Sequence, residues 1–146
     1  MNDDERLYLD NQICFPLYVV SRLTIRVYTP LLEELGITYP QYLVLLALWQ
    51  KDEQLVGELS KVLYLDYNTL TPLLKRLEEK QFINRSRSKS DERSVYISLT
   101  DTGKALKNQA ACIPDKIIES LDKGDMNMDE IVAFQQTLLK IMKTIG

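Results

Sequence analysis

The sequence predicts one mainly helical domain with a single small β-hairpin, and three observations support this class. Apolar residues recur every three or four positions over most of the 146 residues, which is the spacing of a helix face. Only residues 82–99 include a change to strict alternation, which is typical of a strand. Hydrophobic residues make up 45% of the chain, which is enough to bury a sizeable core and excludes a disordered tail.

The first helix is expected over about residues 10–35. Pro16, near its start, lacks the amide hydrogen that a helix uses, which predicts an irregular first turn. Gly36 is a suitable left-handed residue to end the helix. The face that repeats at helical spacing consists of Leu17, Val20, Thr24, Val27, Leu31 and Leu35.

A second helix follows at once. Thr38 and Gln41 have the spacing of a capping box, in which each side chain bonds to the backbone of the other residue. The run Tyr42–Trp49 is apolar on every side, which predicts a helix that is buried on all faces.

Two shorter helices come next. The first carries an apolar face made of Val56, Leu59, Val62 and Leu63. Asp66 is a favourable N-cap for the second. That helix is expected to bury Leu70, Leu73, Leu74 and Leu77.

A hairpin and two more helices complete the chain. Residues 82–87 and 95–99 form the expected strands, and the tip Ser88–Glu92 is charged and rich in serine. Thr100 caps a long helix that bends near Pro114, with an apolar stripe of Leu106, Ala110, Ile113, Ile117 and Leu121. A capping box from Asn127 to Glu130 opens the last helix, whose core side holds Ile131, Leu138, Ile141 and Ile145.

Charge is distributed unevenly along the chain. The net charge is −3, but residues 71–93 hold seven basic and four acidic residues, a local charge of +3. The rest of the chain therefore carries −6. A basic segment on an acidic body is the charge layout of a module that touches phosphate with one edge.

The middle of the chain has the layout of a winged helix-turn-helix: a short helix, a turn, an amphipathic helix and a basic ribbon. The second of these helices fits a major groove, where its polar side chains reach base edges or phosphate. Asp91, two residues before Arg93, could hold the guanidinium extended toward a narrow minor groove. The alternative is a solvated turn with a surface ion pair worth about 0–1 kcal/mol. The candidate DNA-binding residues are Tyr67, Asn68, Thr69, Thr71, Lys75, Arg76, Arg87, Lys89, Asp91 and Arg93.

Three stretches, Tyr39–Tyr42, Leu65–Glu78 and Asp91–Thr100, resemble the MarR family of transcription regulators. The segment Leu9–Tyr18 is similar to the organic hydroperoxide-sensing branch of repressors called OhrR. The resemblance covers about residues 9–106. One departure concerns the helix that family members usually open with Asp-Ser-Gly-Thr, because here the residues are Asp66-Tyr67-Asn68-Thr69. The family's operator sequence therefore does not carry over to this chain.

The apolar stripes of the terminal helices have no partner left within a compact lobe, so we expect them to pair two copies across a two-fold axis. The homodimer would then bind a pseudo-palindromic double-stranded DNA operator. We expect an N-terminal dimerisation helix with the sensor cysteine (1–36), a winged helix-turn-helix lobe (37–99) and C-terminal dimerisation helices (100–146).

The resemblance also implies that Cys14 is the residue that reacts with peroxide. Independently, a thiol near a helix N-terminus faces the positive end of the helix dipole, which favours the thiolate that attacks a peroxide. Tyr18, Tyr28 and Tyr39 match three tyrosines that donate to this thiolate in the family, and the last two come from the other subunit. The alternative for Cys14 is a small buried hydrophobic residue, and for the tyrosines it is core packing.

Cys112 resembles, in its helix and rough placement, a second cysteine that some family members carry. In those proteins it attacks the sulfenic acid from the opposite subunit, which makes it a resolving cysteine. The alternative is an inert thiol, with Cys14 capped instead by a small cellular thiol.

Three functions compete. The first is a repressor released by organic hydroperoxide, and the second is a MarR-type repressor released by a small phenolic ligand. That ligand would bind between the dimer helices and the DNA-binding lobe. The third, a thiol peroxidase that uses Cys14 and Cys112, ranks last because there is no histidine and only Arg22 and Arg26 are basic nearby. We therefore expect a regulator and not an enzyme.

Composition limits cofactors and location. Without histidine and with two cysteines, neither a Cys/His zinc site nor a histidine-based triad can form, so no metal or cofactor is expected. The acidic start Met1–Glu5 is unlike a signal peptide, and Tyr42–Trp49 is far shorter than the ~20 residues that span a membrane. We expect a cytoplasmic protein whose cysteines are thiols.

Overall fold

The computed structural model describes residues 2–91 and 93–146. Met1, and Glu92 at the predicted hairpin tip, lie outside the described residues. The chain is mainly helical with a small sheet, which confirms the predicted class. Two 3-10 turns, η1 (Glu5–Leu7) and η2 (Leu9–Asn11), precede the first helix, α1 (Phe15–Glu33). The later elements are α2 (Tyr39–Gln50), β1 (Gln54–Leu55), α3 (Val56–Leu63), α4 (Tyr67–Glu79), β2 (Ile83–Arg87), β3 (Val95–Leu99), α5 (Asp101–Ala110), α6 (Ile113–Asp122) and α7 (Met128–Ile145).

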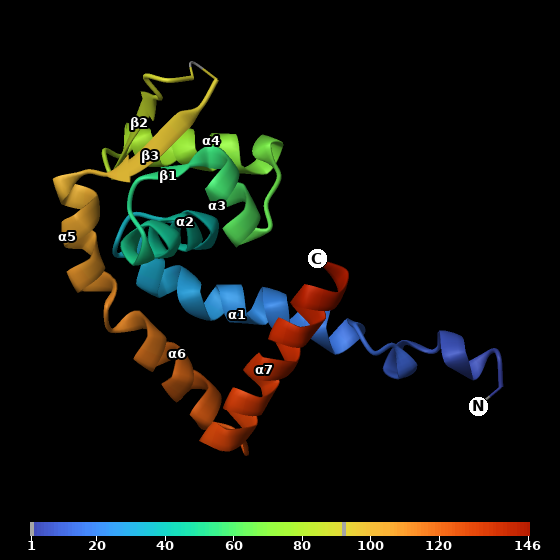
Figure 1. Cartoon of the computed structure of the whole chain (residues 1–146). Coiled ribbons are helices and arrows are strands. Elements are labelled where there is room, and N and C mark those ends of the chain that lie inside the picture. The colour runs from blue at the N-terminus through green and yellow to red at the C-terminus, as the bar shows by residue number, and fades with distance from the viewer. Residues whose placement is uncertain (1, 92) are drawn as a thin grey trace.

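The elements form two regions. The β2–β3 hairpin stands at one end above α3 and α4, and α1, α6 and α7 outline the other end (Figure 1). α5 leads from the sheet down to α6, and the N-terminal segment extends away from the rest of the chain (Figure 1). None of the helices described has the combination of length and hydropathy needed to cross a membrane.

The first helix starts later than predicted, at Phe15 and not near residue 10. Cys14 is its N-cap, and Pro16 lies within its first turn. A proline is favourable there, because the first amide hydrogens of a helix have no partner within the helix. The irregular part of the chain is therefore the pair of 3-10 turns before Cys14, and not the first turn of the helix.

The predicted long helix that begins after Thr100 is in fact two helices, α5 and α6, separated at Ala111–Cys112. Pro114 explains the break, since it has no amide hydrogen for the Ala110 carbonyl and its ring crowds that carbonyl. Ala110 and Ile117 are buried on either side of the break, so the apolar stripe continues across it. The stripe alone therefore gave no sign of the break. Its last residue, Leu121, is exposed.

The sheet has three antiparallel strands in the order β1-β3-β2, one more than the predicted hairpin. In the hairpin Ile83 pairs with Leu99 and Arg87 pairs with Val95. The additional strand, β1, is only two residues long, and Gln54 pairs with Ile97. Two residues are too few to show an alternating pattern, which is why the sequence did not predict this strand.

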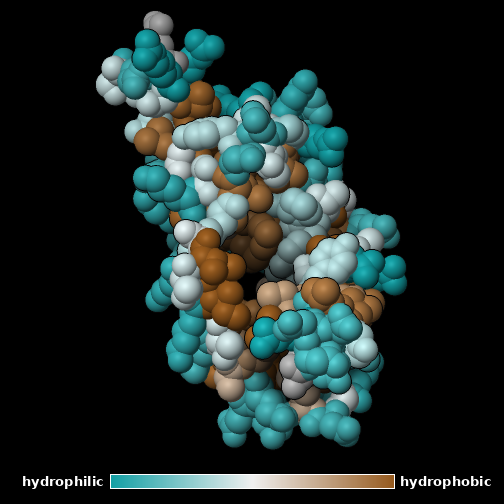
Figure 2. All heavy atoms as spheres, turned by 90° about the vertical axis from the view of Figure 1, so that its right-hand side faces the viewer, coloured by the Kyte–Doolittle hydropathy of each residue, from teal (hydrophilic) through white to brown (hydrophobic). Residues whose placement is uncertain are grey.

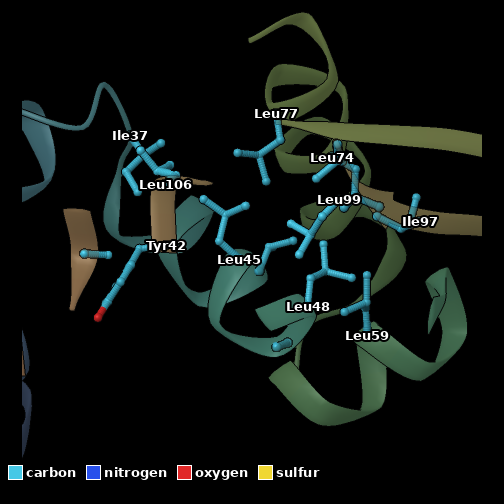
Figure 3. Close-up of a cluster of buried hydrophobic side chains, with 14 of the residues drawn as sticks. Ile37, Tyr42, Leu45, Leu48, Leu59, Leu74, Leu77, Ile97, Leu99 and Leu106 are labelled. Carbon is cyan, nitrogen blue, oxygen red and sulfur yellow. The ribbon is translucent and has the colours of Figure 1, made fainter. Parts of the chain in front are cut away.

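The core lies where α2 meets α3, α4 and the sheet. The leucine stripe of α4 is confirmed: Leu70, Leu74 and Leu77 are buried, and Leu73 is half-buried. These leucines face α2 and the sheet, as Figure 3 shows for Leu45, Leu48, Leu74, Leu77 and Ile97. Two residues that were predicted to be buried in α2 and α3 are exposed. Leu46 is 38% exposed and Val62 is 59% exposed, because both line a cavity between α2, α3, α5 and α6.

The terminal helices keep their apolar faces uncovered. α7 buries none of its residues, and α1 buries only Leu32. This agrees with the expectation that the stripe of α7, although it was called a core side, has no partner within its own lobe; only Ile131 and Leu138 are partly covered. The exposed apolar residues of α1 and α7 are Leu17, Val20, Leu23, Ile25, Val27, Met128, Val132, Phe134, Leu139, Ile141, Met142 and Ile145.

Candidate functional site

The turn between α3 and α4 is held by local hydrogen bonds. Tyr64 ends α3 in the left-handed region with φ 54°, and the Ser60 hydroxyl donates to the Leu65 carbonyl at 2.6 Å. Asp66 then caps α4, as predicted, by accepting from the Thr69 amide at 2.8 Å. This backbone hydrogen bond lowers the pKa of the Asp66 carboxyl, so a negative charge lies at the positive end of α4.

α4 presents a polar face to solvent. Every predicted DNA-binding residue on this helix is exposed, while its leucine stripe is packed into the core. The residues on this face are Tyr67, Asn68, Thr69, Thr71, Lys75 and Arg76. The Tyr67 side chain bends toward α3, so its hydroxyl lies beside Gly57.

The β2–β3 hairpin carries the other four predicted DNA-binding residues, Arg87, Lys89, Asp91 and Arg93, and all four are exposed. Asp91 supports the tip differently from the prediction. Its carboxylate accepts from the Arg93 backbone amide at 3.0 Å and from the Ser94 hydroxyl at 3.2 Å, and it forms no ion pair with the Arg93 guanidinium. Asp91 therefore fixes the backbone that leads into Arg93.

An ion pair joins the hairpin to α4. The Arg85 guanidinium donates to the Glu78 carboxylate at 3.0 Å, and this hydrogen bond lowers the pKa of Glu78. A cavity of about 630 Å³ opens between α3, α4 and the hairpin. It is lined by Lys61, Tyr67, Thr71, Arg85 and Arg93 among others, so the polar face and the basic hairpin border one concave surface. This shape and charge suit contact with a phosphate backbone.

The thiol of Cys14 is exposed at the N-terminus of α1. The Cys14 carbonyl accepts from the Tyr18 amide at 3.0 Å, which makes Tyr18 the residue one turn further along α1. The Tyr18 ring is exposed and lies under the Arg22 guanidinium, with 4.8 Å from the guanidinium carbon to the ring centroid. In the single chain the Cys14 thiol is therefore not a small buried hydrophobic residue, which was the alternative.

The other two predicted tyrosines lie far from the Cys14 of the same chain. Tyr28 is fourteen residues along α1 from Cys14, which is about 21 Å at 1.5 Å per residue. Tyr28 and Tyr39 instead pack together with ring centroids 4.8 Å apart. Within one chain the structure thus pairs Tyr28 with Tyr39 and leaves Cys14 with Tyr18.

Tyr42 belongs to the same cluster and was missed by sequence reasoning. Its ring centroid is 6.0 Å from that of Tyr28 and 6.4 Å from that of Tyr39. Tyr42 is buried at the edge of the core with its hydroxyl directed away from the leucines (Figure 3). The missed signal is its spacing of three residues from Tyr39, which places both rings on one helix face.

The three hydroxyls of this tyrosine cluster (Tyr28, Tyr39 and Tyr42) remain protonated well above neutral pH. Burial, together with the neighbouring Tyr39 and Tyr42, raises the pKa of Tyr28 to about 12. Burial also raises the pKa values of Tyr39 and Tyr42. Each group can therefore act as a hydrogen-bond donor to an anion.

Cys112 occupies a position like that of Cys14. It is an exposed thiol at the N-terminus of α6, and its sulfur lies 3.8 Å from the Gln109 carbonyl oxygen. Each cysteine is followed two residues later by a proline in the first turn of its helix, Pro16 or Pro114. Both residues are free thiols in this structure.

A second cavity, of about 620 Å³, lies between α2, α3, α5 and α6. Its lining is mainly apolar, with Tyr42 and Trp49 at one side and Lys107 as a charged neighbour. Figure 2 shows hydrophobic side chains around a hollow on the face of the molecule seen from the right-hand side of Figure 1. Tyr42 belongs both to this apolar cavity and to the tyrosine cluster.

Comparison with known proteins gives a consistent assignment. Residues 26–110 match the family described as transcriptional regulator SarA/Rot. The organic hydroperoxide resistance transcriptional regulator of Bacillus subtilis (strain 168) is 44% identical over 141 residues, which cover 97% of this chain and 96% of that protein.

Solved structures agree. Reduced AbfR bound to DNA, a protein of Staphylococcus epidermidis, matches with a TM-score of 0.74 and 36% identity over 99% of this chain and 100% of that chain. Disulfide-formed AbfR gives a TM-score of 0.63 at 39% identity, covering 95% and 96% of the two chains. A mutant MarR of E. coli complexed with operator DNA gives 0.76 at 28% identity, covering 86% and 89%. The chain therefore belongs to the SarA/Rot family of transcriptional regulators and has the MarR-type winged-helix fold that its motifs predict.

Proposed function

We propose that the protein is a homodimeric repressor that releases its operator when an organic hydroperoxide oxidises Cys14. One observation carries the proposal: Cys14 is an exposed thiol at a helix N-terminus, in a chain that is 44% identical to a hydroperoxide resistance regulator. The relative AbfR adds support, because it has been solved both reduced on DNA and with a disulfide.

α4 is the recognition helix of this proposal, and the β2–β3 hairpin is the wing. The exposed polar residues of α4 are directed to base edges in a major groove, and Arg93 at the wing is directed to the adjacent minor groove. Two copies related by a two-fold axis would place their recognition helices about 34–36 Å apart, which suits a pseudo-palindromic operator. The uncovered apolar faces of α1 and α7 supply the surface for this dimer.

The switching reaction starts at the thiolate. The Cys14 sulfur attacks the terminal oxygen of the hydroperoxide, the O–O bond breaks, and the alkoxide leaves and takes a proton to become an alcohol. Cys14 is oxidised to the sulfenic acid while the peroxide is reduced. Neutral tyrosine hydroxyls suit the starting state, since they donate to the thiolate without neutralising it.

In this proposal the tyrosine hydroxyls that donate to each Cys14 thiolate come from both subunits. Tyr18 comes from the chain that carries Cys14, whereas Tyr28 and Tyr39 of the partner subunit would complete the set, because within one chain they are too distant. Oxidation removes the charge that these donors stabilise and adds an oxygen atom next to them. The resulting misfit is what repositions the two DNA-binding lobes.

The test is a gel shift on the protein's own upstream DNA, with and without cumene hydroperoxide. The reduced wild-type protein is expected to bind, to release the DNA after peroxide treatment, and to bind again after reduction. A Cys14→Ser variant is expected to bind as well as wild type and to stay bound after peroxide. Peroxide-driven release of the serine variant would exclude this role for Cys14.

The apolar cavity favours a second candidate, a repressor released by a small phenolic ligand. Tyr42 and Trp49 offer aromatic surface and Lys107 offers a positive charge to a phenolate or carboxylate. In this case salicylate without peroxide would release the wild-type protein and the Cys14→Ser variant equally. Release by salicylate with no response to peroxide would favour this candidate over the thiol switch.

A further inference from the structure

Lys80 makes a polar connection between α4 and the junction of α1 with α2. It is the C-cap residue of α4, at the opposite end of the helix from the N-terminal residues that we assign to base contacts. Its ammonium group donates to the Gly36 carbonyl at 2.6 Å and to the Gln41 side-chain oxygen at 2.9 Å. Gly36 and Gln41 are 44 and 39 residues away in sequence, so only the fold brings the three together.

The two acceptors belong to different helices. Gly36, with φ 70°, follows the end of α1, where the negative end of the helix dipole favours a cation. Gln41 lies in the first turn of α2 and is only 1% exposed. Its side-chain oxygen also accepts from the Thr38 amide at 3.1 Å, which closes the capping box of α2. One ammonium group therefore fixes the end of α1 and the start of α2 at the same time.

This junction is directly attached to the tyrosine cluster. Tyr39 is the first residue of α2, two positions before Gln41, and its ring packs against Tyr28 of α1. A shift of α2 at Tyr39 therefore also shifts Gln41, one of the two acceptors of Lys80. Within the part of the chain that the structure describes, the two bonds of Lys80 are the only hydrogen bonds between α4 and this junction.

We propose that Lys80 is a positioning residue that transmits a change at the tyrosine cluster to the recognition helix. The inference rests on the proposed thiol switch, and it names the contact through which that switch reaches α4. The leucine stripe of α4 holds the helix on the core in either state, whereas Lys80 sets its C-terminal end relative to α1 and α2. Without the ammonium group, α4 stays packed in the lobe, but its C-terminal end no longer moves together with the junction of α1 and α2.

The test compares the loss of operator affinity on oxidation in wild type, Lys80→Met and Lys80→Arg. Lys80→Met keeps an aliphatic side chain of similar length and removes the donors, while Lys80→Arg keeps a positive charge and N–H donors at this position. Lys104→Met, on α5, removes one positive charge elsewhere and controls for a general effect of charge on DNA binding. Formation of the Cys14 sulfenic acid is followed in each protein by its added mass.

Couplings between distant sites typically change affinity by about 5- to 150-fold, and we expect the wild-type loss to fall in that range. Lys80→Met is expected to shrink this loss by about 2- to 30-fold, the effect of mutations along a coupling route. Lys80→Arg and Lys104→Met are expected to keep most of the loss, and Cys14 is expected to oxidise at the same rate in all four proteins. The unchanged rate shows that sensing is intact, while full operator affinity of reduced Lys80→Met and rescue by Lys80→Arg separate transmission from a merely structural role.

Two results would overturn the proposal. If Lys80→Met loses as much affinity on oxidation as wild type, Lys80 does not transmit the change, although the thiol switch itself stands. If wild type keeps its operator after Cys14 has been oxidised, the switch is absent, and the proposed function fails together with the role of Lys80.

Discussion

The Tyr67 hydroxyl lies 2.9 Å from the point that a Cβ atom on Gly57 would occupy. Tyr67 is the first residue of α4 and Gly57 is in the first turn of α3, so the Tyr67 hydroxyl occupies space that a side chain at position 57 would need. Tyr67 is also one of the residues at which this helix departs from the Asp-Ser-Gly-Thr opening of the family that its motifs resemble. A side chain at position 57 would push the ring outward, toward the surface that we assign to DNA.

This contact predicts that Gly57→Ala and Tyr67→Phe are coupled. In the Tyr67→Phe background, Gly57→Ala should raise the free energy of unfolding by about 0.5–1 kcal/mol, because alanine favours a helix over glycine. In the wild-type background the gain should be smaller, since the hydroxyl has to move. Urea unfolding of the four proteins measures the difference. Equal gains in both backgrounds would show that the contact has no energetic weight.

Arg93 and Leu74 should separate binding from stability. Arg93→Ala removes an exposed wing residue and should weaken operator binding by about 1–3 kcal/mol with little change in Tm. Leu74→Ala removes a fully buried side chain and should lower the free energy of unfolding by about 2–5 kcal/mol through a cavity. Fluorescence anisotropy and thermal unfolding measure the two effects. An Arg93→Ala variant with full operator affinity would contradict the assignment of the wing.

Cys112 should form a disulfide with the Cys14 of the other subunit after mild peroxide treatment. Both thiols are free and exposed, but a disulfide needs Cα atoms within about 4.4–6.8 Å. Non-reducing electrophoresis should show a covalent dimer that either Cys→Ser change abolishes. A dimer that survives in Cys112→Ser, or no dimer in wild type, would leave Cys112 without a resolving role and favour a small thiol as the partner of Cys14.

The apolar face of α7 should hold two chains together. Sedimentation at micromolar concentration should give twice the mass of one chain, and Ile141→Glu should shift the protein toward monomer and weaken operator binding. Gln136→Glu, on the opposite side of the same helix, adds the same charge and should leave the dimer intact. A monomeric wild-type protein at this concentration would refute the dimer.

The tyrosine cluster predicts a loss of stability at alkaline pH. The folded chain raises the pKa of Tyr28 from 10.0 to about 12, so between these values it retains a proton that the unfolded chain has lost. The free energy of unfolding should therefore be unaffected by this group below pH 10 and should fall as pH rises toward 12. Tyr28→Phe should make this fall shallower in urea titrations at several pH values. An identical fall in wild type and Tyr28→Phe would contradict the raised pKa.

Local chemistry was the part of the fold that the sequence predicted best. The caps at Thr38, Asp66, Thr100 and Asn127 are all present, because each depends on residues within one helical turn. An element that depends on a more distant contact, the strand β1 paired with β3, was missed. The break at Ala111–Cys112 was predicted only as a bend near Pro114, because the buried stripe continues through it.

The candidate site shows the same division. The exposed face of α4 follows from the spacing of its leucines, so its polar residues could be identified in advance. Tyr42 was overlooked within its apolar run, although its spacing of three residues from Tyr39 places both rings on one helix face. The Lys80 contact depends on residues about 40 positions away, and no periodicity within the sequence reports such a distance.

The uncovered face of α7 ties the lifetime of the protein to its abundance. A helix that buries nothing within its own chain is protected from unfolding and proteolysis only while a second copy covers it. Newly made chains at low concentration would be degraded faster than chains at high concentration. A cell would then hold this regulator above the concentration at which dimers form, or would lose it altogether.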